Sequence, residues 1–111
     1  SDYSAPASQI NLANRQIVLA DRMARRVAEV VSGGEKSISS ADALSRDTAV
    51  FSQILSGLKS GNTELNVMAV SSPAAMSSVV AAEQLFSESV KEIKIVLLTT
   101  SIYVVFSQIA I

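Results

Sequence analysis

Residues 10–31 read INLANRQIVLADRMARRVAEVV, and this stretch decides which fold the sequence predicts. Apolar side chains recur along it in alternating steps of three and four residues, which is the spacing of one face of an α-helix. The members of this first apolar stripe are Ile10, Ala13, Ile17, Ala20, Ala24, Val27 and Val31. A second apolar flank consists of Leu12, Leu19, Met23 and Val30. We therefore expect a helix that uses the first stripe as its packing seam and has neighbours on more than one side.

Signals on both sides of this stretch set the limits of the first helix and the start of the next. Residues 1–9 are rich in Ser and Ala around Pro6 and are predicted to be a loose lead-in. The helix is expected to end at Ser32-Gly33-Gly34, because glycine tolerates the left-handed backbone that a helix C-cap often requires. Ser39 and Asp42 then have the spacing of a capping box, which predicts a second helix.

The second helix is expected to pack against the first as an antiparallel hairpin, because only a short glycine turn joins them. Its end is predicted at Gly61-Asn62. The residues at helical spacing on its buried face are Leu44, Thr48, Phe51, Leu55 and Leu58.

A third helix is predicted from Ser72-Pro73, where serine suits the N-cap and proline the first helical position. One of its sides presents Val79, Ala82, Phe86, Val90, Ile93 and Leu97. Before it, residues 65–70 fit either a strand or an extended linker, and we expect this connection to pack along the helices.

Residues 95–111 contain no charged side chain, and three interpretations stay open. The stretch fits a buried fourth helix that begins near residues 99–101 and turns Ile102, Phe106 and Ile109 inward. It fits a strand, because Ile, Val, Thr and Tyr favour strands. It also fits the start of a membrane span. The predicted fold is all-α, an antiparallel three- to four-helix bundle built on a helical hairpin, with residues 1–111 forming one module.

The composition excludes several classes of function. Nine Lys and Arg residues stand against ten Asp and Glu, so no strong positive field is available to hold a nucleic acid. The 111 residues include no Cys and no His, which removes thiol chemistry, the commonest catalytic base and the commonest transition-metal ligand. We expect a non-enzymatic domain without cofactor or metal.

Polar side chains on the first helix are the candidate binding residues. Arg15 and Arg22 lie two turns apart, and the first stripe as seam would turn both away from the hairpin. A guanidinium is a planar, permanently charged fork that suits small anions. Asn11 lies beside the two arginines, so Asn11, Arg15 and Arg22 form a candidate anion-binding set. The alternative is an ordinary solvated arginine surface offset by nearby acidic residues.

The run from Ile10 to Ala24 resembles the signature helix of PilJ-type domains, the periplasmic sensory modules of type IV pilus methyl-accepting chemotaxis proteins. The likeness rests on Arg15, Leu19, Ala20, Arg22 and Met23, with Asp21 in place of a longer Glu or Gln. It continues through residues 33–34, 41–42, 45–51 and 58–62, thins through the third predicted helix, and is not recognisable after Glu92. The pattern is more similar to the second than to the first of two tandem helical modules.

The resemblance implies a sensory domain in the periplasm, held by flanking membrane segments that lie outside this sequence. It implies a role in chemotaxis signalling that controls twitching motility, a homodimer in the full receptor, and a pilin or another periplasmic protein as partner. The same helix is distantly similar to the anion-binding helix of nitrate sensor kinases through Ile10-Asn11, Ala13 and Arg22. The arginine that holds nitrate there falls on Val18, so nitrate is not expected, whereas Arg15 suits another small anion.

Two other interpretations remain on the sequence alone. The chain fits a structural helical domain that docks another protein without a small ligand. It also fits a rod-like subunit of a secretion system, which would likewise be small, helical and rich in Ser and Ala.

Overall fold

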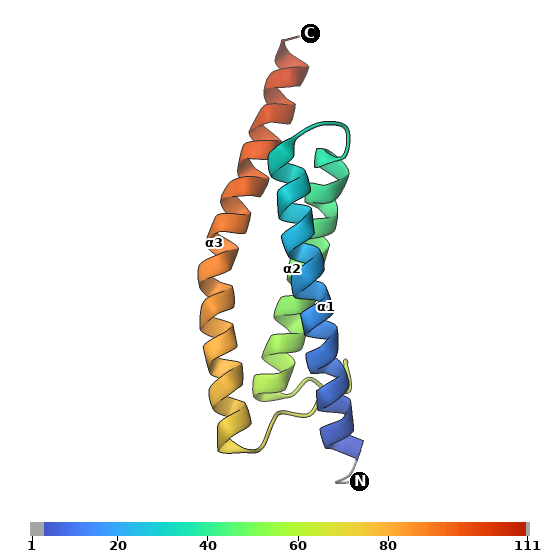
Figure 1. The fold of residues 1–111 in the computed structure, drawn as a ribbon, viewed down its shortest axis with the longest axis vertical. Coiled ribbons are helices and arrows are strands. Elements are labelled where there is room, and N and C mark those ends of the chain that lie inside the picture. Colours follow the sequence, from blue (N-terminus) through green and yellow to red (C-terminus); the bar gives the residue numbers. More distant parts are fainter. Residues whose placement is uncertain (1–3, 111) are drawn as a thin grey trace.

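The computed structural model describes residues 4–110 of the chain, and they confirm the all-α prediction (Figure 1). Three helices follow one another, α1 (Ser4–Ser32), α2 (Ser37–Ser60) and α3 (Pro73–Ile109). The molecule is a rod with extents of 61 × 21 × 21 Å. Helix α2 runs antiparallel to α1, while α3 runs back in the direction of α1 and continues past the α1–α2 turn.

The first helix begins earlier than predicted. The loose lead-in proposed for residues 1–9 is wrong for residues 4–9, which are helical, while residues 1–3 lie outside the described part of the chain. Pro6 falls in the first turn of α1, where its missing N–H costs no hydrogen bond. A proline this close to a helix start therefore does not exclude helix around it.

The packing seam of α1 is the second apolar flank, and the prediction that the first stripe packs into the hairpin is wrong. Leu19 is 3% exposed, whereas Ile17, a member of the first stripe, is 68% exposed. Both sets have helical spacing, but the buried set contains the larger side chains at most positions. Burying Leu and Met removes more apolar area from water than burying Ala, so the hairpin closes on that face.

Two apolar clusters form the core between the helices. The first joins Leu19 on α1, Ile54 and Leu58 on α2, and Val67 from the connection that follows α2. The second joins Met23, Leu44 and Ile93, one residue from each helix. The predicted inner face of α2 is confirmed: its members are buried or half-buried.

Glycines form the α1–α2 turn as predicted. Gly33 and Gly34 have φ values of 72° and 90°, in the left-handed region that a side chain would strain. The predicted capping box at Ser39 and Asp42 is wrong, because α2 already begins at Ser37 with Lys36 as its N-cap residue and no side-chain cap bond. The Ser39 hydroxyl instead donates to the Lys36 carbonyl. The helix starts as soon as the glycine turn closes.

The connection between α2 and α3 packs along the hairpin, as predicted. It forms no strand: Asn62 and Val67 make one isolated bridge, and the Val70 amide donates to the Leu58 carbonyl at 2.8 Å. The Gln9 side chain donates to the Met68 carbonyl at 3.1 Å and so ties the connection to α1. Val67 in this connection is buried and completes the first of the two apolar clusters.

Helix α3 starts as predicted, with the Ser72 side chain accepting a hydrogen bond from the Ala75 amide. Its predicted inner side is confirmed as buried or half-buried, and the rings of Phe86 and Phe51 lie 4.9 Å apart. A 2.8 Å ion pair between Lys59 and Glu83 adds a polar link to α2. The inner face of α3 therefore follows the sequence pattern closely.

The fourth helix and the strand proposed for residues 95–111 are both wrong over the described residues, because α3 runs unbroken to Ile109. No glycine or proline interrupts this stretch, and its hydroxyl groups bond to carbonyls one turn earlier, as Thr99 does to Ile95. The proposed inward residues point to solvent: Ile102, Phe106 and Ile109 are all exposed. By length and composition alone, α3 could cross a membrane, and it is the one helix of the described chain with this property.

Candidate functional site

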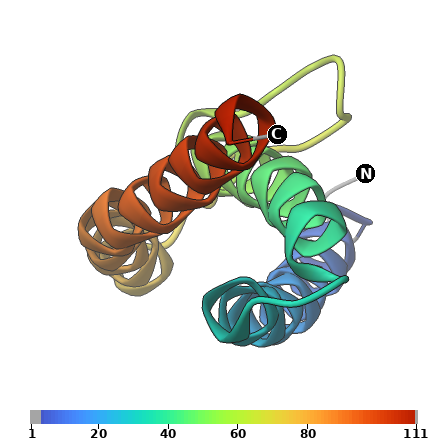
Figure 2. The same cartoon turned by 90° about the horizontal axis from the view of Figure 1, so that it is seen from above.

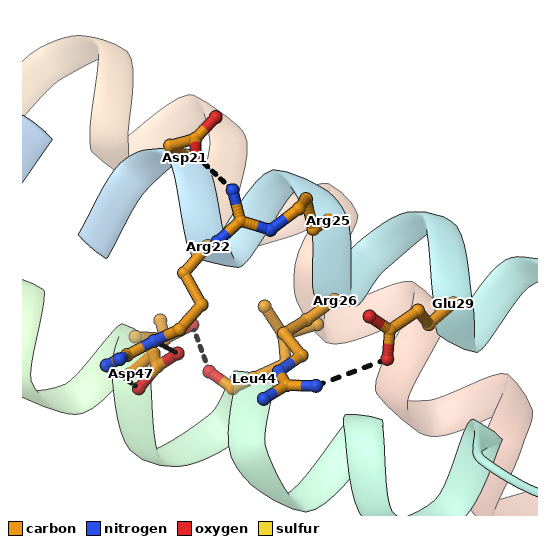
Figure 3. A network of polar contacts seen from close by, with 8 residues as sticks. Asp21, Arg22, Arg25, Arg26, Glu29, Leu44 and Asp47 are labelled. Atoms are coloured by element: carbon orange, nitrogen blue, oxygen red, sulfur yellow. Dashed lines mark hydrogen bonds and ion pairs between the residues drawn. The ribbon is translucent and has the colours of Figure 1, made fainter. Parts of the chain in front are cut away.

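Charged side chains link α1 to α2 along one edge of the hairpin (Figure 3). Arg22 donates two hydrogen bonds to the Asp47 carboxylate, from Nε and from one terminal nitrogen, each at 2.8 Å. One α1 turn further on, Arg26 donates to Glu29 at 3.2 Å. Glu29 also accepts a hydrogen bond from the Ser40 hydroxyl of α2. This edge is a set of paired charges.

The polar contacts between the two helices share one register. Gln16 donates to the Phe51 carbonyl at 2.9 Å, below the Arg22–Asp47 pair, while the Glu29–Ser40 contact lies above it. As the residue numbers rise along α1 they fall along α2, as an antiparallel pairing requires. A slide of either helix by one turn would break all three contacts together.

The structure places the predicted anion-binding residues on one flank of α1, with different surroundings. Asn11 and Arg15 are exposed to solvent. The prediction that Arg22 faces away from the hairpin is wrong, because the packing seam of α1 differs from the predicted one and brings Arg22 alongside α2. Its Asp47 partner is only 14% exposed. The structure thus gives Arg22 a carboxylate within the same chain as its anion.

Two of the paired groups have shifted pKa values. The hydrogen bonds and the charge of Asp47 raise the pKa of Arg22, against a smaller effect of desolvation. The Ser40 hydrogen bond, with smaller help from Arg26 and Lys36, lowers the pKa of Glu29 against a desolvation that acts the other way. Both shifts stabilise the charged forms that join α1 to α2.

An apolar groove runs between α1 and α3. Viewed along the rod, the three helices form an open arc with α2 between the other two (Figure 2). The open side holds a hollow of about 610 Å³. Its lining residues are Ala20, Met23, Ala24, Val27, Phe51, Ala82, Leu85, Phe86, Ser89, Glu92, Ile93 and Val96. Apolar side chains thus dominate a concave surface, which is the usual character of a binding site.

Sequence reasoning missed this groove, although it had noticed part of it. Ala20 and Ala24 belong to the first stripe and were expected inside the hairpin seam, but they form the α1 wall of the groove. Their small size keeps the hollow open. The alternation of small and large residues on that stripe was the available signal, and it could not be interpreted without the position of α3.

The comparisons with known proteins bear on the class of protein. No family model and no solved structure matches the chain. Protein PilJ of Pseudomonas aeruginosa is 36% identical over 95 residues, which cover 83% of this chain and 14% of that protein. The putative methyl-accepting chemotaxis AlkN of Alcanivorax borkumensis is 33% identical over 88 residues, which cover 79% of this chain and 13% of that protein.

These similarities first define the class of protein. The chain is a segment related to methyl-accepting chemotaxis proteins, and it has a chemoreceptor-related role in signal transduction. Within that class the chain belongs to the PilJ-type domains, as its resemblance over residues 10–24 predicted. The chain spans about one seventh of the length of these two relatives. The activities and partners of a whole receptor are therefore matters of proposal.

Proposed function

We propose that this chain is a non-catalytic sensory domain of a type IV pilus chemoreceptor, located in the periplasm, and that the groove between α1 and α3 receives the stimulus. The stimulus is a periplasmic protein, with a pilin subunit as the first candidate. Binding moves α3 relative to the hairpin, and the receptor converts that movement into control of twitching motility. The three helices act as a bundle whose open side is closed by the bound partner.

The observation that supports this mechanism most is the unequal packing of the three helices. Contacts between α1 and α2 combine a leucine-rich core with charged pairs in one register. Helix α3 is long, yet among its described residues only Ile93 is buried. A ligand shifts a conformational equilibrium only as far as it binds one state more tightly than the other. A helix with few buried side chains needs the smallest difference in affinity in order to move. The hairpin is thus the frame and α3 the element that moves.

Membrane attachment and dimerisation belong to the same proposal. The apolar end of α3 passes the α1–α2 turn and ends beyond it (Figure 1), and its length and composition suit a continuation into the inner membrane. A homodimer would place two such helices side by side in the membrane, so that one displacement reaches a paired signalling region.

Anion binding at Asn11, Arg15 and Arg22 remains a separate prediction. With Arg22 engaged by Asp47, a bound anion would have to use Arg15 and Asn11 or displace a carboxylate. The melting temperature of the receptor measured with and without small anions tests this. A ligand at one hundred times its dissociation constant would add about 2.7 kcal/mol to stability.

Two alanines one turn apart on α1 allow a matched test of the groove. Ala24 lines the groove, whereas Ala28 is exposed and does not line it. In the full-length receptor, Ala24→Phe should fill the groove and change both twitching motility and receptor methylation, because it competes with the partner. Ala28→Phe should leave both unchanged. Normal signalling by the Ala24→Phe receptor would refute the groove as the stimulus site.

Location has its own test, in which an introduced cysteine would be the one thiol within these 111 residues. A Ser45→Cys variant presents a thiol at an exposed position of α2. A membrane-impermeant maleimide should label it in cells whose outer membrane alone has been permeabilised. Labelling that requires lysis of the inner membrane would place the domain in the cytoplasm and contradict the proposal.

A further inference from the structure

The end of the rod that contains the α1–α2 turn has exposed apolar side chains on all three helices. Val31, the last apolar residue of α1, is 68% exposed, and Ile38 in the first turn of α2 is 54% exposed. On α3 an outward stripe with heptad spacing begins where the charged residues stop, and its members are all exposed: Ile95, Leu98, Ile102, Val105 and Ile109.

The α3 part of this surface is too wide for the seam of one further helix. Residues 102–106 read IYVVF, and at 3.6 residues per turn five successive residues put an apolar or aromatic side chain on every side of the helix. Tyr103 and Phe106 are both largely exposed beside the stripe. A helix that is apolar all round is covered by a protein core or by lipid, and in the described part of the chain no core covers these two rings.

The hydroxyl groups in this part of α3 are bonded within the helix. Thr99, Thr100 and Ser101 donate to the carbonyls one turn earlier, at 2.9 to 3.0 Å. Ser107 donates to the Tyr103 carbonyl at 2.9 Å. Polar groups in lipid need partners inside the protein, because hydrocarbon offers none. These four side chains therefore suit a lipid environment.

The α1–α2 turn lies beside the part of α3 in which this change occurs (Figure 1). A hollow of about 590 Å³ opens between them, and its α3 wall extends from Thr99 to Gln108. The turn itself contains two exposed charged residues, Glu35 and Lys36. Charged side chains are costly in hydrocarbon, so the turn can enter the headgroup layer of a membrane but no deeper. Its position therefore limits how far α3 can insert.

We propose that the α1–α2 turn lies in the headgroup layer of the membrane that α3 enters, and that the membrane surface crosses α3 between Thr99 and Tyr103. The inference rests on the proposed membrane attachment of α3 and adds a second contact with a phospholipid surface, made by the hairpin. Tyr103 then lies at the interface, which suits a ring with a polar end. Glu35 and Lys36 carry opposite charges, so the contact depends on apolar burial at Val31 and Ile38 rather than on anionic lipid.

This contact has a consequence for signalling. With the turn held in the headgroup layer, the hairpin does not follow α3 along the membrane normal. A movement of α3 against the hairpin is then also a movement of α3 relative to the membrane, and the membrane-spanning part of the receptor receives it.

Fluorescence quenching in the full-length receptor tests the contact. Each receptor has a single bimane-labelled cysteine, any cysteine outside these residues being replaced, in vesicles of phosphatidylethanolamine and phosphatidylglycerol. Acyl chains brominated near the headgroup quench a label in lipid, and iodide on both sides of the membrane quenches a label in water. Val31→Cys and Ile17→Cys are a matched pair, because both side chains are 68% exposed on one stripe of α1 and lie about 21 Å apart along the helix.

The Val31→Cys label should lose most of its fluorescence in brominated lipid, whereas the Ile17→Cys label should not. On α3, Phe106→Cys and Ile95→Cys form a second pair of similar exposure, and only the Phe106→Cys label should respond to the lipid. Quenching of the Val31→Cys label by iodide alone would overturn the proposal. Protection of that label from both quenchers would also overturn it, because a protein would then cover the turn.

A charge variant tests whether apolar burial holds the turn. In the Ile38→Cys receptor, Val31→Asp should reduce quenching by brominated lipid, because a carboxylate favours water over the border of the acyl chains. Ile17→Asp is the control and should leave the quenching unchanged. Replacing phosphatidylglycerol by phosphatidylcholine should also leave it unchanged. Full quenching in the Val31→Asp receptor, or loss of quenching without phosphatidylglycerol, would contradict the proposed contact.

Failure of this inference can be separated from failure of the proposed membrane attachment. If lipid quenches the Phe106→Cys label but not the Val31→Cys label, α3 enters the membrane and only the contact of the turn is wrong. If lipid quenches neither label, the attachment itself is wrong. The groove variant Ala24→Phe is independent of both results.

Discussion

The hairpin seam of α1 and the outward face of α3 have the same heptad spacing of apolar residues but different surroundings. On α1 the set that contains Leu19 and Met23 is buried against α2. On α3 the set from Ile95 to Ile109 is exposed over its whole length. Spacing therefore marks where a helix can pack. Whether it packs there depends on a partner of suitable size, within the chain or outside it.

The largest expected effect comes from neighbouring residues on the two faces of α1. Leu19→Ala should destabilise the fold by about 2–5 kcal/mol, because it removes buried methyl groups and leaves a cavity in the first apolar cluster. Ile17→Ala should change stability by no more than about 0.5 kcal/mol, because that side chain is in water. Urea unfolding of the two variants measures both free energies.

An Ile17→Ala loss as large as that of Leu19→Ala would show that the first stripe is buried after all. The urea dependence of the free energy should stay the same in both variants, since neither changes the surface exposed by unfolding. This pair of variants is the most direct check on which face of α1 closes the hairpin.

A smaller effect is expected at the charged edge of the hairpin. Arg22→Ala and Asp47→Ala should each destabilise the fold, and the double variant should lose less than the sum of the two, because each single change already removes the same pair of hydrogen bonds. Arg22→Lys should recover only part of the loss, since an ammonium cannot donate the two parallel bonds of a guanidinium. Added salt should reduce the coupling, because Arg22 is partly exposed.

Fully additive losses at Arg22 and Asp47 would contradict the pairing. The Asp47→Ala variant also sharpens the prediction of anion binding at Arg22. Suppose that the Asp47→Ala receptor binds a small anion that the natural sequence does not bind. This result would show that Arg22 can bind an anion and that Asp47 fills this role in the natural sequence.

The smallest expected effect is a dependence of stability on acid pH through Glu29. Its folded-state pKa is lowered from the ordinary value of 4.5, mainly by the Ser40 hydroxyl. Its contribution to stability is therefore fully present above pH 4.5 and is lost as the pH falls through the lower folded-state value. Glu29→Gln should remove this part of the pH dependence, and Ser40→Ala should shrink it.

Thermal unfolding followed between pH 3 and pH 7 would measure this difference between the natural sequence and the variants. An unchanged pH profile in the Glu29→Gln variant would mean that another carboxylate governs the acid response. Ser40→Ala tests the cause of the shift, since it leaves the carboxylate in place and removes its hydrogen bond from α2.

Much of the secondary structure could be predicted because its signals are local. The glycines at 33 and 34 end α1, Ser72 and Pro73 start α3, and Gly61 ends α2, as expected. The start of α2 was missed because a capping box at Ser39 competed with an earlier turn that needs no side-chain cap. Residues 95–111 were divided among three interpretations, because their β-branched composition favours a strand while the absence of glycine and proline permits a helix.

The candidate site was predicted less well than the fold. Asn11, Arg15 and Arg22 do lie on one flank of α1, but the partner of Arg22 is a carboxylate 25 residues away in the sequence. No local pattern contains that pairing. The groove needs the relative placement of α1 and α3, whose residues lie more than 50 positions apart.

By itself the sequence determined the class of fold, three of the six helix termini and the family to which the chain belongs. These follow from the helical repeat, from glycine and proline at particular positions, and from residue identities that need no neighbour in space. Only the tertiary structure decided which of the two helically spaced stripes on α1 is buried, which acid binds Arg22, and that α3 leaves a groove on one side and an uncovered stripe on the other. The physical reason is that burial depends on the combined volume of side chains from separate helices, and periodicity along one helix contains no information about that volume.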